Sequence, residues 1–176
     1  GFTFSARRDQ AGEIDVYDKR AGTTHVVKVL AVFAYESSRK RSSYVVELPP
    51  ALLRACDGEH AVRVYTKGAD SVVLPLLEAG TRGTDEASMR TMNAQLDEWA
   101  NIALRTLVFA KREVSPRAFE VWFAKYAAAT ADASEILKMR KGEPNAIIDL
   151  QAELECELTL MGATAIEDKL QDGVPE

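Results

Sequence analysis

The stretch Thr24-His25-Val26-Val27-Lys28-Val29-Leu30-Ala31-Val32-Phe33-Ala34-Tyr35 contains the longest uncharged apolar run of the sequence, from Val29 to Tyr35. Successive side chains of a strand point to opposite faces of a sheet. Here the odd and the even positions are both mostly apolar, so the stretch predicts a central strand that is covered on both sides. The run is much shorter than the ~20 apolar residues that a membrane-spanning helix needs, so we expect no such helix.

Further strands are expected before and after this stretch. Alternating polarity and apolar runs mark them, and the turn signals Ala11-Gly12, Ala21-Gly22 and Asp57-Gly58 separate several of them. The expected strands cover residues 2–7, 14–19, 24–35, 44–48, 61–66, 105–110 and 158–166.

Helices are expected mainly in the second half, where apolar residues recur in steps of three and four. Proline at the first helical position after a serine is a typical helix start. The expected helices are 85–103 with Thr84 or Asp85 as N-cap, a helix that begins at Ser115-Pro116, a helical region over 133–157 broken or kinked at Gly142 and Pro144, and a short helix through 72–74 capped by Asp70 or Ser71. The fold class is therefore α+β, with a mainly antiparallel twisted sheet of about six or seven strands flanked by helices.

Composition excludes collagen-like, fibrous and wholly disordered proteins. The 176 residues include 47% hydrophobic and 28% charged residues, which is typical of a globular domain. The net charge of −5 argues against a nucleic-acid partner. Cys56 and Cys156 are expected to be reduced thiols in a cytosolic setting. Arg7, Arg8 and Asp9 argue against a signal peptide, and both ends of the chain suggest a piece excised from a longer protein.

The sequence contains no complete set of catalytic residues that a known motif would mark. A G-x-x-x-x-G-K-[ST] loop, a G-x-G-x-x-G, an H-E-x-x-H and a G-x-S-x-G are all missing. His25 and His60 have no second ligand at metal-binding spacing, so we expect no metal site. A role in binding and positioning is therefore favoured over catalysis by this chain alone.

Three segments carry candidate binding residues. Tyr35 at a strand end precedes the consecutive cations Arg39-Lys40-Arg41, which suits a flat base and nearby phosphates, or is a solvated basic turn. Lys67-Gly68-Ala69-Asp70 follows a strand and permits close approach to the backbone, or is a strand-to-helix turn. Arg105 lies where a helix gives way to a strand, and alone it indicates little.

These segments, in this order, resemble the nucleotide-binding (N) domain of P-type ATPases, most closely the type IV branch, the phospholipid flippases. Asp70 and Asp168-Lys169-Leu170-Gln171 favour the lipid branch, because cation pumps carry K-G-A-P-E and a different hinge. The resemblance covers nearly the whole chain and rests on Gly1-Phe2-Thr3-Phe4 (G-F-x-F), the stretch Tyr35 to Ser43 (F-x-S-x-R-K-R-M-S), Tyr65-Thr66-Lys67-Gly68-Ala69-Asp70 (Y-x-K-G-A-D), Leu104-Arg105-Thr106-Leu107 (G-L-R-T-L) and the stretch Leu160 to Glu176 (L-L-G-A-T-A-I-E-D-K-L-Q-D-G-V-P-E).

The resemblance implies an ATP site. Tyr35 would stack on adenine, Lys40 would lie near the phosphates, Lys67 at the pocket floor, Gly68-Ala69 against the base, and Arg105 would reach the phosphate chain. Three positions depart from the family pattern, with Tyr35 for phenylalanine, Ser42 for the methionine of the adenine pocket wall, and Ala103 for the glycine before L-R-T-L. These departures imply a weaker or shallower adenine site. Because the pocket would also be one-sided without its partner domain, we expect weak ATP binding, on the order of 0.1–10 mM.

The resemblance also implies how the chain is divided. Residues 1–160 would be the nucleotide-binding domain, and residues 161–176 the hinge strand, with Thr164 and Asp168, and the start of the phosphorylation domain. The family's phosphorylated aspartate lies in D-K-T-G-T, which is missing here, so no catalytic residue is assigned and the chain alone is expected to be inactive. Magnesium would be bound mostly by the phosphorylation domain.

The parent protein, by the same resemblance, would hydrolyse ATP to move phospholipid, with this domain on the cytosolic face of a membrane and not inserted in it. Its partners would be ATP and the phosphorylation and actuator domains of the same polypeptide, and the isolated domain would be a monomer. Two alternatives stay open. One alternative is an interaction module with a degenerate nucleotide pocket, which the residues Ser42 and Ala103 would fit. The second alternative is the equivalent domain of a cation-pumping P-type ATPase.

Overall fold

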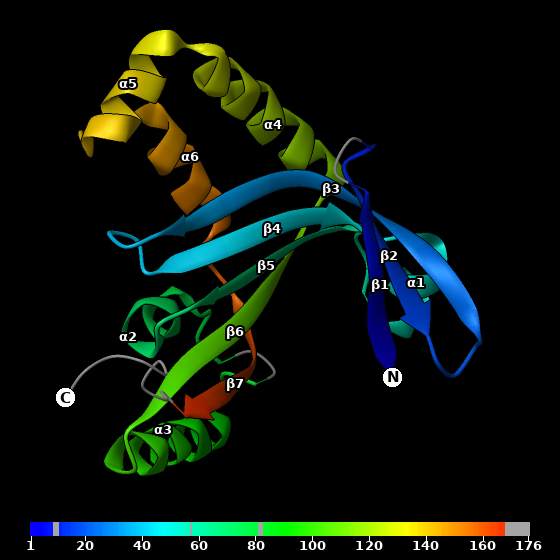
Figure 1. Ribbon diagram of the computed structural model, residues 1–176, viewed down its shortest axis with the longest axis vertical. Helices are drawn as coiled ribbons and strands as arrows, with labels where there is room; N and C mark the ends of the chain where they lie inside the picture. The colour runs from blue at the N-terminus through cyan, green and yellow to red at the C-terminus, as the bar shows by residue number, and fades with distance from the viewer. Residues whose placement is uncertain (9–10, 57, 81–82, 168–176) are drawn as a thin grey trace, which may run out of the picture.

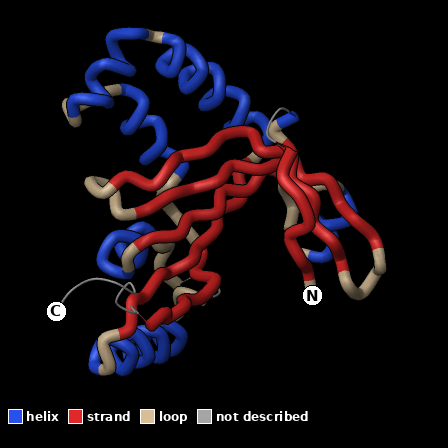
Figure 2. The backbone as a smooth tube through the Cα atoms, in the orientation of Figure 1, coloured by secondary structure: helices blue, strands red, loops and turns tan. Residues whose placement is uncertain are grey.

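The computed structural model describes residues 1–8, 11–56, 58–80 and 83–167. Its strands form one strongly curled sheet in which every neighbouring pair is antiparallel and the spatial order follows the chain (Figures 1 and 2). The strands are β1 (Phe2–Arg8), β2 (Glu13–Asp18), β3 (Thr23–Glu36), β4 (Arg41–Glu47), β5 (Val62–Gly68), β6 (Leu104–Val114) and β7 (Thr159–Glu167).

Helices lie in the connections between strands. Six α-helices and one 3₁₀ helix are found in the described part of the chain. They are α1 (Pro50–Ala55), α2 (Asp70–Val73), η2 (Leu74–Leu76), α3 (Glu86–Asn101), α4 (Pro116–Ala131), α5 (Ala133–Lys141) and α6 (Ala146–Leu154). The expected α+β class with a mainly antiparallel sheet is confirmed.

Several helix ends are set by the residues that the sequence indicates. The Asp85 side chain accepts a hydrogen bond from the Ser88 amide at the start of α3, and Ser115 accepts one from the Ala118 amide at the start of α4. Gly142 ends α5 with a left-handed φ of 70°, so the expected helical region over 133–157 is two helices. These ends follow from local chemistry alone.

Helices cover one face of the sheet along most of its length. The aromatic side of α4, with Trp122, and the apolar side of α6 pack on Phe33, Val45 and Val64. Helices α2 and α3 pack on Val108 and Ala110 of β6. Within the described residues, the opposite face is covered at one end, where α1 and β2 pack on β3 and β4 around Val27 and Val46. Figure 1 shows α4, α5 and α6 grouped beside β3 and β4, and α3 beside β6 and β7.

Two expectations about local structure are wrong, and one helix was missed. The β3 strand is not covered on both sides, because Val26 and Val32 are each 40% exposed. Odd-numbered and even-numbered positions of β3 are both apolar partly because the pairing with β4 shifts between Val29 and Ala31. This shift interrupts the alternation of side chains between the two faces of the sheet. Helix α1 follows Pro49 and was not expected. The N-cap of α2 is Ala69, which has no capping side chain, and not Asp70 or Ser71.

The described helices include none that is both long and apolar enough to span a membrane. Cys56 and Cys156 are free thiols and both are partly exposed.

Candidate functional site

The strand register brings several of the candidate residues to the uncovered face of the sheet. Ser42 of β4 is paired with Lys67 of β5, and Lys67 is paired with Phe109 of β6. Directly paired residues have their side chains on the same face. Because side chains alternate along a strand, Arg105 and Leu107 share the face of Phe109, opposite the buried Val108 and Ala110.

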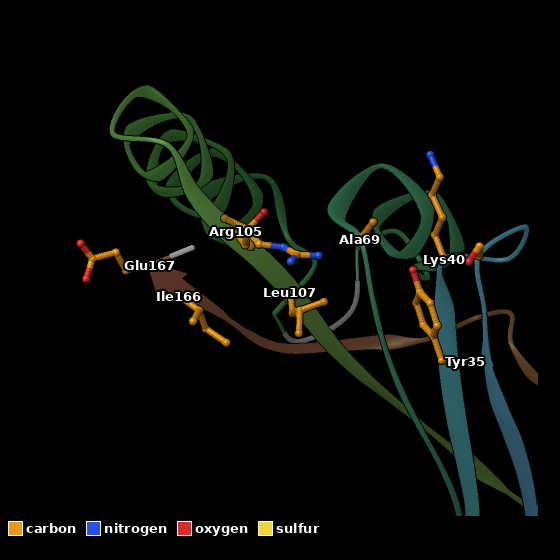
Figure 3. A pocket seen from close by; sticks show the side chains of 9 residues that line it. Tyr35, Lys40, Ala69, Arg105, Leu107, Ile166 and Glu167 are labelled. Atoms are coloured by element: carbon orange, nitrogen blue, oxygen red, sulfur yellow. The ribbon is translucent and has the colours of Figure 1, made fainter. Parts of the chain in front are cut away.

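A pocket of about 600 Å³ lies at this end of the sheet, and we call it the sheet pocket. It is formed by the β3–β4 hairpin, the start of α2, and the first part of β6 with the last part of β7 (Figure 3). Its lining residues are Tyr35, Ser37, Lys40, Ala69, Arg105, Thr106, Leu107, Ile166 and Glu167. The pocket therefore joins segments that are far apart in the sequence.

Four of the seven predicted ATP-site residues line the sheet pocket. Tyr35 and Lys40 stand on the hairpin side, Ala69 lies beside them, and Arg105 extends from β6 toward Ala69 (Figure 3). Tyr35 is 63% exposed, and its ring belongs to none of the aromatic ring pairs found among the described residues. A ring with a free face beside two cations suits a flat, anionic ligand.

The other three predicted residues lie next to the pocket without lining it. Lys67 is exposed and shares the sheet face of Arg105, whereas Ser42 and Gly68 are buried. Of the predicted hinge residues, Thr164 is paired with Leu107 within β7 and β6. Asp168 lies outside the described residues.

The basic stretch divides into two roles. Lys40 is exposed, but Arg39 is only 8% exposed and its guanidinium is bound to the carboxylate of Glu155. The Arg41 Nε donates to the same carboxylate over 2.7 Å. The interpretation of three cations available to phosphates is therefore wrong for two of them, because the guanidinium groups of Arg39 and Arg41 are both engaged by the buried carboxylate of Glu155.

Gly68 has a structural reason to be glycine. A Cβ built at this position would lie 2.6 Å from the Lys40 carbonyl oxygen and 2.6 Å from the Arg41 Cβ. The backbones of β4 and β5 therefore meet too closely here for a side chain. The sequence analysis explained this glycine by the close approach of a ligand to the backbone, but the close approach of β4 alone accounts for it.

Two non-glycine residues beside the pocket have left-handed backbone. Lys40 has a φ of 48° at the tip of the β3–β4 hairpin, and Ala103 has a φ of 57° between α3 and β6. This conformation costs an alanine roughly 1 kcal/mol relative to glycine. The family pattern places a glycine where Ala103 stands, and the turn into β6 gives the physical reason.

The chemistry available at the sheet pocket is that of binding. In the ranges that the structure describes, no three His, Cys, Asp or Glu side chains are grouped as metal ligands. Tyr65 lies on the same sheet face as Lys67, and burial raises the pKa of its hydroxyl above the usual value. The pocket is lined by one ring, two cationic side chains, the carboxylate of Glu167, two hydroxyl side chains, and the apolar side chains of Ala69, Leu107 and Ile166.

Comparison with known proteins gives the family. The family model described as "P-type ATPase, cytoplasmic domain N" matches residues 13–173. The chain belongs to this family. The expectation of a P-type ATPase N domain is thereby confirmed.

Three relatives of this N domain have similar names. It is 35% identical over 176 residues to phospholipid-transporting ATPase IC of Homo sapiens, and 33% identical over the same length to phospholipid-transporting ATPase C887.12 of Schizosaccharomyces pombe. It is also 35% identical to phospholipid-transporting ATPase DNF1 of Saccharomyces cerevisiae. Each match covers the whole chain but only 12%, 12% and 10% of the respective relative.

Sequence reasoning missed part of the pocket wall of the N domain. Leu107 follows from Arg105 by strand alternation, but Ile166 and Glu167 enter only because β7 pairs with β6. Glu155 was missed altogether, because its ion-pair partner Arg39 is 116 residues away in the sequence. No local pattern marks a contact of that range.

Proposed function

We propose that this N domain binds ATP in the sheet pocket and positions it for phosphoryl transfer to an aspartate in a separate domain of the parent protein. The observation that carries the proposal is the convergence on one pocket of the β3–β4 hairpin with Tyr35 and Lys40, the start of α2 with Ala69, and β6 with Arg105. Phosphoryl transfer depends mainly on positioning and charge neutralisation, which are the properties that this pocket offers.

Each side of the pocket suits one part of the nucleotide. The exposed ring of Tyr35 offers a stacking surface for adenine, and Lys40, Arg105 and the nearby Lys67 offer positive charge to the phosphates. Ala69 leaves the backbone at the start of α2 accessible beside them. Ser42 and Gly68 support this surface from β4 and β5. Magnesium would accompany ATP and be held mostly by the phosphorylation domain.

The parent protein is proposed to be a phospholipid-transporting ATPase. The names of the relatives support this branch over a cation pump. On this proposal the N domain lies on the cytosolic face of a membrane, works with the phosphorylation and actuator domains, and has no ATPase activity alone. Residues 161–176 would be the hinge toward the phosphorylation domain, with β7 as its first part.

A matched pair of variants tests ATP binding. Arg105→Gln is expected to weaken ATP binding to the chain about fivefold, because one charge-assisted contact to phosphate is lost. Arg117→Gln removes the same charge from an exposed position on α4, outside the sheet pocket, and is expected to weaken binding less than twofold, through net charge alone. Nuclear magnetic resonance titrations, with and without magnesium, measure both.

Equal affinities for the two variants would contradict the proposed site. No binding of ATP by the unmodified chain would favour the alternative of an interaction module with a degenerate pocket.

A further inference from the structure

We propose that Glu155 is a positioning residue for the sheet pocket, because its buried carboxylate fixes the hairpin tip from which Tyr35 and Lys40 reach the nucleotide. This inference rests on the proposed function. Glu155 lies on the helix-covered side of the sheet, directly after α6, so it acts without touching the ligand.

The carboxylate of Glu155 accepts hydrogen bonds from three residues of the β3–β4 hairpin. It is fully buried, and it accepts hydrogen bonds from the Arg39 guanidinium, from Arg41 Nε over 2.7 Å and from Ser43 Oγ over 2.6 Å. Arg41 and Ser43 are alternate residues of β4, so their side chains share one face of that strand, and Arg39 donates from the turn that precedes it. Ser43 Oγ lies 2.8 Å from Thr66 Oγ1, which extends the network to β5.

The same hairpin presents its other side to the pocket. Lys40 lies between Arg39 and Arg41 in the sequence, and its side chain lines the pocket from the hairpin that also carries Tyr35 (Figure 3). Its carbonyl oxygen accepts a hydrogen bond of 3.0 Å from the Ala69 amide, which also lines the pocket. Fixing the two arginines therefore fixes the residue between them and its link to α2.

Stability alone is a weak reason for such a cluster. Buried ion pairs often stabilise a protein no more than apolar side chains of the same volume, because the charges must be desolvated. In the described part of the chain, Nε and Nη1 of Arg39 are buried without a hydrogen-bond partner, which adds to that cost. Lys40 is also held at a φ of 48°, a conformation that persists only where its surroundings enforce it. The cluster is thus better explained as a device that fixes geometry.

Glu155→Gln tests the inference, with Glu157→Gln as the matched control. Glu157 forms an ion pair with Arg112 over 2.5 Å and is 63% exposed, so its variant makes the same change in net charge at the surface. A less negative domain attracts ATP more strongly, so charge alone would tighten binding in both variants. We expect Glu155→Gln to weaken ATP binding at least fivefold, and Glu157→Gln not to weaken it.

A double-mutant cycle separates positioning from a merely structural role. Lys40→Gln is expected to weaken ATP binding about fivefold in the unmodified chain and less than twofold in the Glu155→Gln background, because the lysine is no longer held in place. An unchanged effect of Lys40→Gln in that background would overturn the inference, as would unchanged affinity in Glu155→Gln.

A neutral variant covers the case in which Glu155→Gln does not fold. Ser43→Ala removes one donor to the carboxylate and changes no charge. It is expected to weaken ATP binding about twofold and to speed hydrogen exchange at the Arg39 and Lys40 amides, which donate to the Glu36 carbonyl. Unchanged affinity and exchange would overturn the inference. Failure of the unmodified chain to bind ATP would instead refute the proposed function, a result that none of the variants can imitate.

Discussion

At the scale of single residues, Ala103 is an alanine in a backbone conformation that disfavours a side chain. Its φ of 57° is a left-handed conformation that glycine adopts without strain. We predict that Ala103→Gly raises the free energy of unfolding by about 1 kcal/mol, measured by urea denaturation.

The control for this prediction is Ala94→Gly, in the exposed interior of α3. There glycine is expected to lower the free energy of unfolding by about 1 kcal/mol. A loss of stability in Ala103→Gly would show that the turn before β6 does not strain the alanine.

Gly68 gives the opposite prediction. A methyl group here would collide with the Lys40 carbonyl and with Arg41. Gly68→Ala is expected to lower the free energy of unfolding by about 1–3 kcal/mol, because β4 and β5 must move apart. The comparison is Ala69→Ser, at the next position in the chain, which is expected to change the free energy of unfolding little. Gly80→Ala would not be a matched control, because Gly80 has a φ of 78° that strains any side chain. Equal stabilities of the Gly68 and Ala69 variants would refute the close approach.

At the scale of elements, α3 gives a pH-dependent prediction. Hydrogen bonds from Ser88 hold the pKa of Asp85 below its usual value of 3.8. A carboxylate whose pKa is lower in the folded state stabilises the protein above its unfolded pKa, and this stabilisation is lost as the pH falls through the folded pKa. Asp85→Ala should therefore lower the Tm at pH 7, and the difference from the unmodified chain should shrink below about pH 4.

Calorimetric scans at several pH values measure this difference. Asp97→Ala, on the exposed side of the same helix, is the control and should not lower the Tm at pH 7. A deficit in Asp85→Ala that persists undiminished at low pH would mean that the cap does not act through its charge.

Elements with a local cause could be predicted from the sequence. The starts of α3 and α4 follow from Asp85 and Ser115, and the break after α5 follows from Gly142. The short α1 was missed because its six residues follow Pro49 and show no full helical period. The prediction that β3 is covered on both faces was wrong, because the pattern of apolar residues shows which positions are apolar and not which helices pack on them.

At the scale of the whole molecule, the site was predictable in part. Motif resemblance selected Tyr35, Lys40, Ala69 and Arg105, and all four line one pocket. Glu155, by contrast, contacts a hairpin more than a hundred residues earlier, with separations of 116 and 114 residues to Arg39 and Arg41. Such contacts depend on how α6 packs against the sheet, which no local spacing encodes.

The most direct test of the central claim is a titration of ATP into the isotope-labelled chain, followed by nuclear magnetic resonance. We predict saturable shifts on the order of 0.1–10 mM ATP, clustered at Tyr35, Lys40, Ala69 and Arg105. No shifts in that range, or shifts clustered on α4 and α5, would contradict the assignment of the sheet pocket to ATP.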